Sequence, residues 1–568
     1  MNPATRERIL DELTLLYDDK SGEVLGDVEE LINSWIPRIE KRGAGWSEQD
    51  VFLITYGDSI RSRHVASLEL LQHFLIKYAG PCLSMVHILP FYPYTSDDGF
   101  SVVDFREVDP DLGEWKHVEE LSDSYRLVYD AVINHVSQES RYVEDHLNGG
   151  ELYRDFVIEE DPDFDSSQVT RPRTSPLFHE FVGKNGPVKL WTTFSRDQVD
   201  LNYANPAVLL EILDVLLDYA CRGASMVRLD AIPYMWKKSG TNCVHLPQTH
   251  GFIRLVRAVF DAACPHVLVL SETNVPHQEN LTYFGNGSDE ANIIYNFTLA
   301  PLIIFSLTKG DATALTKWAS TLEQISDTCT YLNISATHDG IGMRPTEGIL
   351  DESEREILTE LAKNHGGSVA MRSNPDGTKS PYELNLTFFD ALNNPNDFSV
   401  PVETQVKRFL AAQAITFVLP GIPGIYIHSL LGSRNDYRGR DRSGIPRRIN
   451  REKLDAARLE ADLSDTNSIR SQVLKGMLEL LRVRQRQPAF HPNAKHELLE
   501  IDPRIVAVKR VSRDEEQRQT ILALTNVSSD PIDVETEAES GGRFVISGRP
   551  MSGPMVHLDP YEVCWIEF

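Results

Sequence analysis

Short apolar runs that end in polar residues recur along this chain. Residues 226–230 follow an amphipathic, helix-like segment at 208–219 and place Arg228 and Asp230 two apart on one face of an apolar strand. Charged side chains are rarely buried without a partner, so this pair indicates either an internal ion pair or a chemical role. Both alternatives stay open on this segment alone.

The same pattern occurs at three further positions, where a strand-like run leads into residue types that are common in active sites. In a barrel of parallel strands the C-terminal strand ends converge on one face, so we expect these residues to share a pocket. The runs are 126–133 before Asn134 and His135, 267–270 before Ser271 and Glu272, and 331–334 before His338 and Asp339.

The alternation of strand-like and helix-like segments predicts an α/β protein, a (β/α)8 barrel of the TIM type. Helical periodicity separates the strands and is lost in two longer, polar, Pro- and Gly-containing stretches, which we interpret as inserted loop domains. The eight expected strands are 51–56, 85–89, 126–134, 226–230, 267–272, 292–297, 330–334 and 424–427.

The domain organisation follows from these interruptions. The second stretch is punctuated by turn-forming residues, notably at 373–378, and the C-terminal part alternates apolar and polar residues as an antiparallel sheet does. We expect a helical lead-in at 1–48, barrel segments at 49–139, 204–340 and 403–490, inserted domains at 140–203 and 341–402, and a C-terminal β domain at 491–568.

Composition narrows the function classes. The 568 residues include 84 Asp and Glu against 56 Lys and Arg, a net charge of -28, which argues against nucleic-acid or anionic-membrane partners. Six scattered cysteines indicate reduced thiols, with no disulfide framework or metal-ligand spacing. No signal-peptide core or membrane-length apolar run is visible, so we expect a cytoplasmic protein. No cofactor or metal is expected.

Four segments, in this order and context, resemble the signature regions of the α-amylase superfamily, glycoside hydrolase family 13: residues 130–135, 228–230, Glu272 and 338–339. Further segments resemble the sucrose phosphorylase subgroup, namely SDDGF at 96–100, RPR at 171–173, THDGIG at 337–342 and GSRND at 432–436. Within that subgroup, WTTF at 191–194 and SPYE at 380–383 are more similar to the glucosylglycerate and glucosylglycerol phosphorylases.

The resemblance implies cleavage of an α-glucosidic bond with retention, which needs a nucleophilic carboxylate and a carboxylic acid that protonates the leaving oxygen. Asp230 is the expected nucleophile, with Arg228 lowering its pKa. Glu272 is the expected acid/base, kept protonated by its apolar strand. Asp339 is then the third carboxylate, which holds sugar hydroxyls and stabilises the transition state.

The same resemblance implies a set of sugar contacts. His135 and His338 would hydrogen-bond glucose hydroxyls, and Asp97 with Arg447 would clamp the far side of the ring. The neighbouring Arg448 is an alternative to Arg447. Two aromatic residues complete the expected sugar site, Phe100 and Tyr234.

Acceptor residues distinguish a phosphorylase from a hydrolase. Arg173 and Tyr382 stand at positions resembling the phosphate contacts of sucrose phosphorylase. Glu383 replaces a Gln of sucrose phosphorylase and suits a small polyol that donates hydrogen bonds to a carboxylate. Three basic residues of the second insertion would offset the charge of glycerate, Arg344, Arg372 and Lys379.

We therefore expect reversible phosphorolysis of 2-O-α-glucosylglycerol to α-glucose 1-phosphate and glycerol, the acidic composition favouring an osmolyte. A glucosylglycerate phosphorylase is the alternative, followed by a sucrose or sucrose 6-phosphate phosphorylase. Two other classes stay open: an α-glucosidase or transglucosidase, and a non-catalytic barrel subunit, which the three carboxylates disfavour. The partners are small molecules, and oligomeric state, including a homodimer, is undetermined.

Overall fold

The computed structural model describes residues 1–373, 378–516, 518–537 and 541–568. Of the turn-rich motif at 373–378, residues 374–377 lie outside the described residues. Within the described ranges, no helix is both long and apolar enough to cross a membrane.

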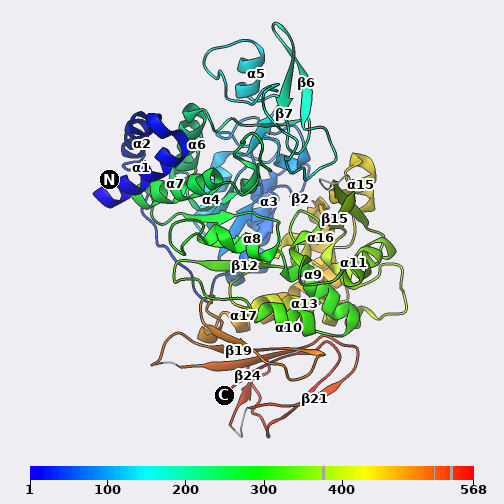
Figure 1. Cartoon of the computed structure of the whole chain (residues 1–568). Helices are drawn as coiled ribbons and strands as arrows, with labels where there is room; N and C mark the ends of the chain where they lie inside the picture. The colour runs from blue at the N-terminus through cyan, green and yellow to red at the C-terminus, as the bar shows by residue number, and fades with distance from the viewer. Residues whose placement is uncertain (374–377, 517, 538–540) are drawn as a thin grey trace.

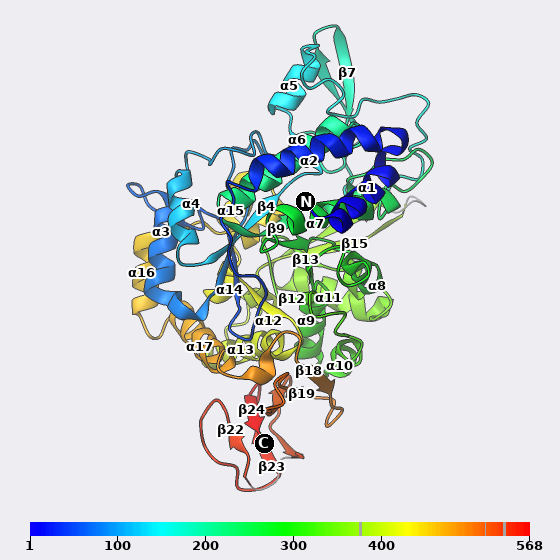
Figure 2. The same ribbon diagram turned by 90° about the vertical axis from the view of Figure 1, so that its left-hand side faces the viewer.

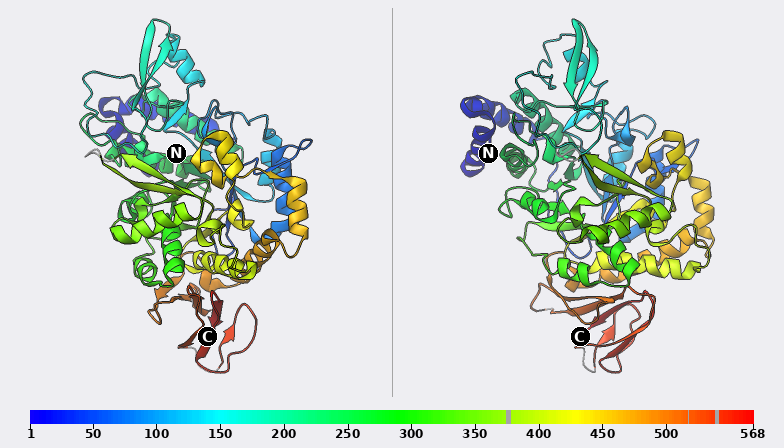
Figure 3. Two further views of the ribbon diagram at one scale, coloured as in Figure 1. Left: turned by 90° about the vertical axis from the view of Figure 1, so that its right-hand side faces the viewer. Right: turned by 45° about the vertical axis from the view of Figure 1, so that its right-hand side comes forward.

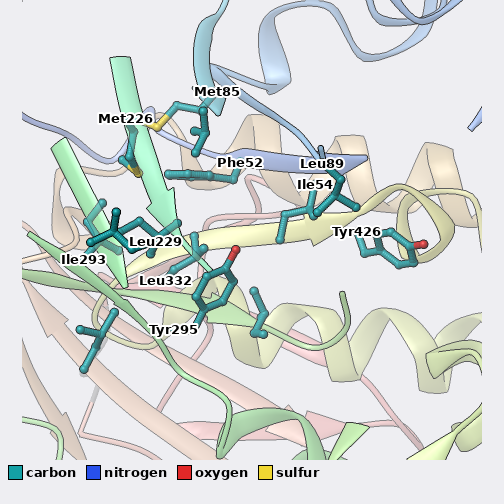
Figure 4. Packing of buried hydrophobic residues seen from close by; sticks show 14 of the residues in the cluster. Phe52, Ile54, Met85, Leu89, Met226, Leu229, Ile293, Tyr295, Leu332 and Tyr426 are labelled. Carbon is teal, nitrogen blue, oxygen red and sulfur yellow. The ribbon is translucent and has the colours of Figure 1, made fainter. Parts of the chain in front are cut away.

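Eight parallel strands close into a barrel in the order β1-β16-β12-β11-β10-β9-β4-β3. Helices cover the outer face of such a barrel and side chains fill its interior, so both faces of each strand are buried and the strands are near-continuous apolar runs. Figure 4 shows the side chains that fill the barrel, among them Phe52, Met226 and Leu332. All eight strands expected from the periodicity are confirmed: β1 Phe52–Thr55, β3 Met85–Ile88, β4 Arg126–Ala131, β9 Ala224–Leu229, β10 Leu268–Ser271, β11 Ile293–Tyr295, β12 Thr330–Ile334 and β16 Ile422–Tyr426.

Amphipathic helices surround the barrel (Figure 1). The segment expected to be helical at 208–219 forms α6, Pro206–Cys221, which begins with Asn205 capping the Ala207 amide and Pro206 in the first turn. The other principal helices are α3 Ser67–Phe74, α4 Trp115–Ser122, α7 Pro247–Ala263, α9 Leu299–Lys309, α13 Val402–Val418 and α17 Ile469–Arg484. Shorter helices complete the layer: α8 His277–Leu281, α10 Thr313–Ala319, α12 Phe388–Leu392, α14 Ile427–Leu430, α15 Tyr437–Ser443 and α16 Ala456–Ser464.

The N-terminal lead-in consists of two helices, α1 Pro3–Tyr17 and α2 Ser21–Trp35. They pack on α7 and α6 on the outside of the barrel (Figure 2). The Tyr17 hydroxyl donates a hydrogen bond to the carbonyl oxygen of Tyr203, and the Trp35 indole nitrogen donates one to Asp214 at 2.7 Å. The lead-in is therefore part of the outer layer and lies away from the strand ends that carry the polar residues.

Two long excursions leave the barrel at the C-terminal ends of β4 and β12. The first contains β5 His135–Ser137 paired with β8 Gln198–Asp200, helix α5 Arg141–Leu147, and a hairpin of β6 Phe178–Gly183 with β7 Gly186–Trp191. The second contains β13 Ile341–Gly342, α11 Glu352–Asn364, β14 Ser368–Ser373 and β15 Lys379–Asn385, the strands forming a sheet in the order β13-β15-β14. The domain boundaries themselves stay predictions.

The C-terminal segment is antiparallel β structure, as expected. Its apolar core includes Leu522, Leu558 and Ile566. It lies at the opposite end of the molecule from the β6–β7 hairpin in each view of Figure 3, so it cannot contribute to a site at the strand ends. Its strands are β18 Lys495–Leu498, β19 Ile505–Val511, β20 Thr520–Asn526, β21 Ile532–Glu535, β22 Arg543–Phe544, β23 Met555–Leu558 and β24 Val563–Glu567. A separate two-stranded sheet, β2 Ile60–Arg61 with β17 Leu454–Asp455, belongs to the barrel part of the chain.

Candidate active site

A cavity at the C-terminal ends of the strands collects nearly all of the expected site residues. Its walls come from the barrel and from both insertions, so segments more than 300 residues apart in the chain meet there. Of the predicted residues, Arg228, Arg344, Arg372 and Lys379 are not part of the lining. The expected residues that line it are Asp97, Phe100, His135, Arg173, Asp230, Tyr234, Glu272, His338, Asp339, Tyr382, Glu383 and Arg447.

Arg228 lies beneath the cavity floor and is shared between two carboxylates. It is 2% exposed, and its Nη1 donates to Asp230 Oδ1 at 2.8 Å and also to Asp130 Oδ1. The other oxygen of Asp130 lies 2.7 Å from His87 Nε2. Burial raises the pKa of Asp130, but Arg228 and His87 outweigh this effect, so the pKa is lowered and Asp130 is a carboxylate.

The pKa of Asp230 is raised well above its ordinary value. Burial is the largest cause, the neighbouring carboxylates of Glu272 and Asp130 add to it, and Arg228 opposes it. Arg228 lowers this pKa, as expected, but burial and the neighbouring carboxylates outweigh it, so the net shift is upward. Asp230 contacts the cation directly, at 2.8 Å, which is consistent with the role expected of a nucleophile.

Glu272 follows β10 and lines the same cavity as Asp230. Its Oε2 accepts a hydrogen bond at 3.0 Å from the amide of Ala231, the residue after Asp230. Ala231 has φ 49°, a left-handed conformation that non-glycine residues rarely adopt and that turns its amide toward Glu272. Burial raises the pKa of Glu272, with Arg228 opposing and Asp339 adding, in the direction expected of a general acid.

Asp339 is the ionised carboxylate of the site. Its Oδ1 lies 2.7 Å from Arg447 Nη1, and its Oδ2 lies 3.5 Å from His338 Nε2. Burial raises its pKa, but Arg447, His338 and Arg451 together outweigh burial and hold it below the ordinary range. Three carboxylates with different proton affinities therefore share one cavity, as retaining glycoside chemistry requires.

Arg447 also holds Glu383. Its Nε and Nη2 donate to the two carboxylate oxygens of Glu383 at 3.0 and 2.5 Å, a bidentate ion pair in which Glu383 is 1% exposed. Glu383, on β15, is therefore paired with a cation, whose single charge it shares with Asp339. The alternative residue Arg448 points elsewhere, donating to the Arg451 carbonyl at 2.9 Å, and does not line the cavity.

The far side of the predicted sugar site is closed by Arg451, which the sequence analysis missed. Arg451 is 1% exposed and donates to Asp97 at 3.2 Å, to Asp98 at 2.9 Å and to the carbonyl of His338 at 2.8 Å. Arg451 thus holds Asp97 from behind the cavity wall, while Asp97 and Arg447 both line the cavity. The expected contact of Asp97 and Arg447 with the sugar ring stays a prediction. Residues 446–450 form a 3₁₀ turn, which places Arg447 in the cavity and Arg451 behind it.

A strained turn positions Asp97 and Phe100. Asp97, Asp98 and Gly99 have φ 52°, 52° and 113°, and a Cβ on Gly99 would lie 2.6 Å from the carbonyl oxygen of Pro90, so only glycine fits there. The turn stacks Phe100 on His338, with ring centroids 4.6 Å apart and planes at 6°. The apolar ring therefore faces the cavity, as the resemblance implied.

The two predicted histidines are neutral. Burial lowers the pKa of His135, and it lowers that of His338 to about 3. A neutral imidazole can both donate and accept a hydrogen bond, which suits sugar hydroxyls. His135 Nε2 lies 2.9 Å from the carbonyl of Phe100 and 3.2 Å from Gln198 Nε2, so a ligand hydroxyl would join an existing network.

Arg173 is the cation on the acceptor side. It comes from the first insertion, and its guanidinium carbon lies 5.9 Å from the centre of the Tyr382 ring. Among the residues that the structure describes, no carboxylate pairs with it. Arg344 stands outside the cavity lining, with its Nη2 3.9 Å from Glu279, while Arg372 pairs with Glu347 at 3.0 Å.

Several lining residues were not predicted: Phe194, Gln198, Ala231, Pro233, Asn274 and Val275. Phe194 packs edge-on against Tyr234, with centroids 5.4 Å apart, and it belongs to the 191–194 segment that carried the resemblance. The resemblance of residues 191–194 to the subgroup was the sequence signal that could have identified Phe194. Gln198 and Asn274 are ordinary polar residues, and their contribution follows only from the pairing of β5 with β8 and from the loop after Glu272.

Comparisons with known proteins agree with this geometry. A family profile described as "Alpha amylase, catalytic domain" matches residues 82–340. The chain is 45% identical over 566 residues to a glucosylglycerate phosphorylase of Allomeiothermus silvanus, covering 100% of this chain and 99% of that protein. It is 29% identical over 455 residues to a glucosylglycerol phosphorylase of Marinobacter adhaerens, covering 78% of this chain and 88% of that protein.

Among solved structures, the fold is similar to the crystal structure of sucrose 6F-phosphate phosphorylase from Thermoanaerobacter thermosaccharolyticum. The TM-score is 0.73 at 24% sequence identity, and the match covers 89% of this chain and 98% of that one. This likeness supports the barrel and its insertions as one architecture.

Proposed function

Since the chain belongs to the α-amylase family, glycoside hydrolase family 13, and is a glycoside phosphorylase within it, we propose that it acts on glucosylglycerate. The reaction would be reversible phosphorolysis to α-glucose 1-phosphate and glycerate. Glycerol was the acceptor expected from the sequence, with glycerate as the alternative. The charge balance of the acceptor side and the identity of the relatives support the alternative.

The observation that carries the proposal is a pair of charges in the cavity lining: the cation of Arg173, and the carboxylate of Glu383 that is already paired with Arg447. The bidentate pair with Arg447 reduces the repulsion between Glu383 and an anionic acceptor. Arg173 lines the cavity and has no acidic partner among the described residues. An anionic acceptor, either phosphate or the carboxylate of glycerate, would supply the missing partner.

Two further arginines strengthen the positive potential there. Arg344, Arg173 and Arg372 each act electrostatically on the hydroxyl of Tyr234, lowering a pKa that burial raises. Both Arg344 and Arg372 have acidic neighbours, so they contribute a field and no free hydrogen-bonding charge. Glycerol is neutral and is not attracted by this potential, whereas the carboxylate of glycerate is.

The chemistry we assign is a double displacement. Asp230 attacks the anomeric carbon while Glu272 donates its proton to the leaving oxygen of glycerate, which leaves a covalent glucosyl-enzyme. Phosphate then attacks the same carbon, Glu272 takes the phosphate proton, and Asp230 departs as a carboxylate. Asp339 would hold the ring hydroxyls through both steps, and Arg451 would keep Asp97 in place from behind the cavity wall.

The direct test is inorganic phosphate release from α-glucose 1-phosphate in the presence of glycerate, glycerol, fructose or fructose 6-phosphate, each alone. We expect release with glycerate at the highest kcat/KM. Highest activity with glycerol would assign a glucosylglycerol phosphorylase and overturn the acceptor. Free glucose formed from an α-glucoside in phosphate-free buffer, with no phosphorolysis, would overturn the reaction type itself.

Arg173→Ala should weaken the anionic substrates selectively. We expect KM for phosphate and for glycerate to rise about 10- to 100-fold, the scale of a lost hydrogen bond to a charged group, because the cation is removed. Hydrolysis of an aryl α-glucoside, whose first step needs no anion, should change little. Arg171→Ala, two residues away and outside the cavity lining, is the matched control. Equal losses for both variants would contradict the assignment of Arg173.

Glu383→Gln should shift the acceptor preference. Glutamine can keep one contact to Arg447 but carries no charge, so the guanidinium becomes less compensated and the cavity more positive. We expect the ratio of kcat/KM for glycerate over glycerol to increase, measured by phosphate release. An acceptor profile identical to that of the wild type would place Glu383 outside acceptor selection.

A further inference from the structure

Asn274 lines the cavity two residues after Glu272, the expected general acid. The leaving oxygen must lie within hydrogen-bonding reach of Glu272 to receive its proton. The loop that carries both residues therefore borders the acceptor part of the substrate, and the Asn274 side chain is placed to contact that part directly.

The carbonyl end of the Asn274 amide lies against the backbone of Gly342, on β13 of the second insertion. A Cβ on Gly342 would lie 2.6 Å from Asn274 Oδ1 and 3.0 Å from Nδ2. Gly342 is not among the residues with positive φ, so this contact depends on its missing side chain and not on an unusual backbone angle. Because Oδ1 is buried, the polar atom of Asn274 that the cavity can reach is Nδ2.

The fold gains no hydrogen bond from the Asn274 carbonyl. Among the residues that the structure describes, none donates to Oδ1. A buried acceptor without a partner costs free energy, so an apolar side chain at this position would be at least as favourable for folding. The amide is therefore explained by a ligand and not by stability.

The wall that carries Asn274 also has a positive potential. Arg344 lies two residues beyond Gly342 in the chain. Burial raises the pKa of the Tyr234 hydroxyl, and Arg344 is the strongest of the groups that oppose this rise, ahead of Arg173. Tyr234 lines the cavity, so the potential of Arg344 reaches the acceptor side. A neutral amide donor with a cation behind it suits a carboxylate, which accepts hydrogen bonds and carries a negative charge.

We propose that Asn274 is a specificity-determining residue whose side-chain Nδ2 donates a hydrogen bond to the carboxylate of glycerate. This assignment rests on the proposed function, because glycerol has no carboxylate to accept that bond. Arg173, from the first insertion, contributes its charge to phosphate and glycerate alike. Asn274 acts only on the two reactants that contain the glycerate carboxylate, glycerate itself and glucosylglycerate.

Asn274→Ala tests the assignment in both directions of the reaction. A double displacement separates the two half-reactions, so kcat/KM for each reactant reports its own step. We expect kcat/KM for glycerate and for glucosylglycerate to fall about 10-fold, the scale of a hydrogen bond to a charged group. The values for phosphate and α-glucose 1-phosphate, which lack the carboxylate, should change little. The melting temperature should not fall, because Oδ1 has no partner among the described residues.

Equal losses for all four reactants would overturn the proposal, and so would a variant that unfolds or melts well below the wild type, since Asn274 would then be structural. Asn396→Ala removes an exposed asparagine outside the cavity lining and is the matched control. It should keep all four values of kcat/KM.

Asn274→Asp changes the donor into a negatively charged acceptor of nearly the same shape. We expect the ratio of kcat/KM for glycerate over glycerol to fall below that of Asn274→Ala, because the new carboxylate repels the one on glycerate. An Asp variant with the acceptor preference of the wild type would contradict the assignment.

The wild type separates this inference from the proposed function. A wild type that releases phosphate with glycerol and not with glycerate overturns both. A wild type that uses glycerate, together with an Asn274→Ala variant whose kcat/KM for glycerate is unchanged, overturns the role of Asn274 alone.

Discussion

Asp230→Asn is expected to fold normally and to lose turnover by about 10⁴-fold or more, the scale on which loss of an enzymatic nucleophile acts. The amide is nearly isosteric and can still accept the hydrogen bond from Arg228, which lies 2.8 Å from Oδ1. It cannot form the covalent glucosyl-enzyme, because the amide oxygen is a much weaker nucleophile than a carboxylate. Initial rates of phosphate release from α-glucose 1-phosphate measure the effect.

Circular dichroism and the melting temperature show whether a loss of turnover in Asp230→Asn comes from unfolding or from the missing nucleophile. Removing the charge from Asp230 relieves repulsion with Glu272 and Asp130, which act to raise its pKa, so the melting temperature should not fall greatly. Asp111→Asn, an exposed carboxylate outside the cavity, is the matched control and should keep full activity. A folded Asp230→Asn enzyme with a near wild-type rate would remove Asp230 from its role.

Glu272→Gln should separate substrates by their leaving group. Glucosides with a poor alkoxide leaving group need the proton of Glu272, so their glucosyl transfer should slow by about 10²- to 10⁴-fold. An aryloxide or fluoride ion leaves without protonation, so the first step with an aryl glucoside or glucosyl fluoride should be much less affected. Single-turnover release of the leaving group measures both. Equal losses for the two classes would contradict the acid assignment.

The pH profile provides an independent readout of the same residue. Burial raises the pKa of Glu272, so the wild-type rate on a poor leaving group should persist above the ordinary glutamic acid range and fall as pH rises through the raised pKa. Glu272→Gln has no group to titrate there, and its residual rate should lack that alkaline limb. Retention of the limb in the variant would assign it to another group.

Much of the architecture followed from local patterns. Strands such as 226–230 and 330–334 were recognisable because a parallel barrel buries both faces of each strand, which leaves near-continuous apolar runs. The polar residues at their ends, Asp230, Glu272 and Asp339, followed from the rule that such ends meet on one face. The prediction that these three residues meet in one cavity is confirmed.

The charge partnerships did not follow from the sequence. Arg228 was paired with its neighbour Asp230, but the fold also brings Asp130 from the adjacent strand β4 against it. Burial, with the carboxylates of Glu272 and Asp130, then raises the pKa of Asp230 against the effect of Arg228. Arg451, four residues after Arg447, is a hydrogen-bonding partner of Asp97 that the sequence pattern did not indicate. Such assignments depend on which side chain a turn directs inward, and spacing alone does not encode that.

By itself, then, the sequence determined the barrel, the order of its strands and the carboxylates at their ends, because hydrophobic periodicity and strand-end position are local properties of the chain. Only the tertiary structure decided how each charge is balanced: Glu383 and Asp339 share Arg447, and Asp130 and Asp230 share Arg228. The physical reason is that a buried charge is stabilised by whichever opposite charge the fold places within hydrogen-bonding distance, and these partners come from segments far apart in the chain.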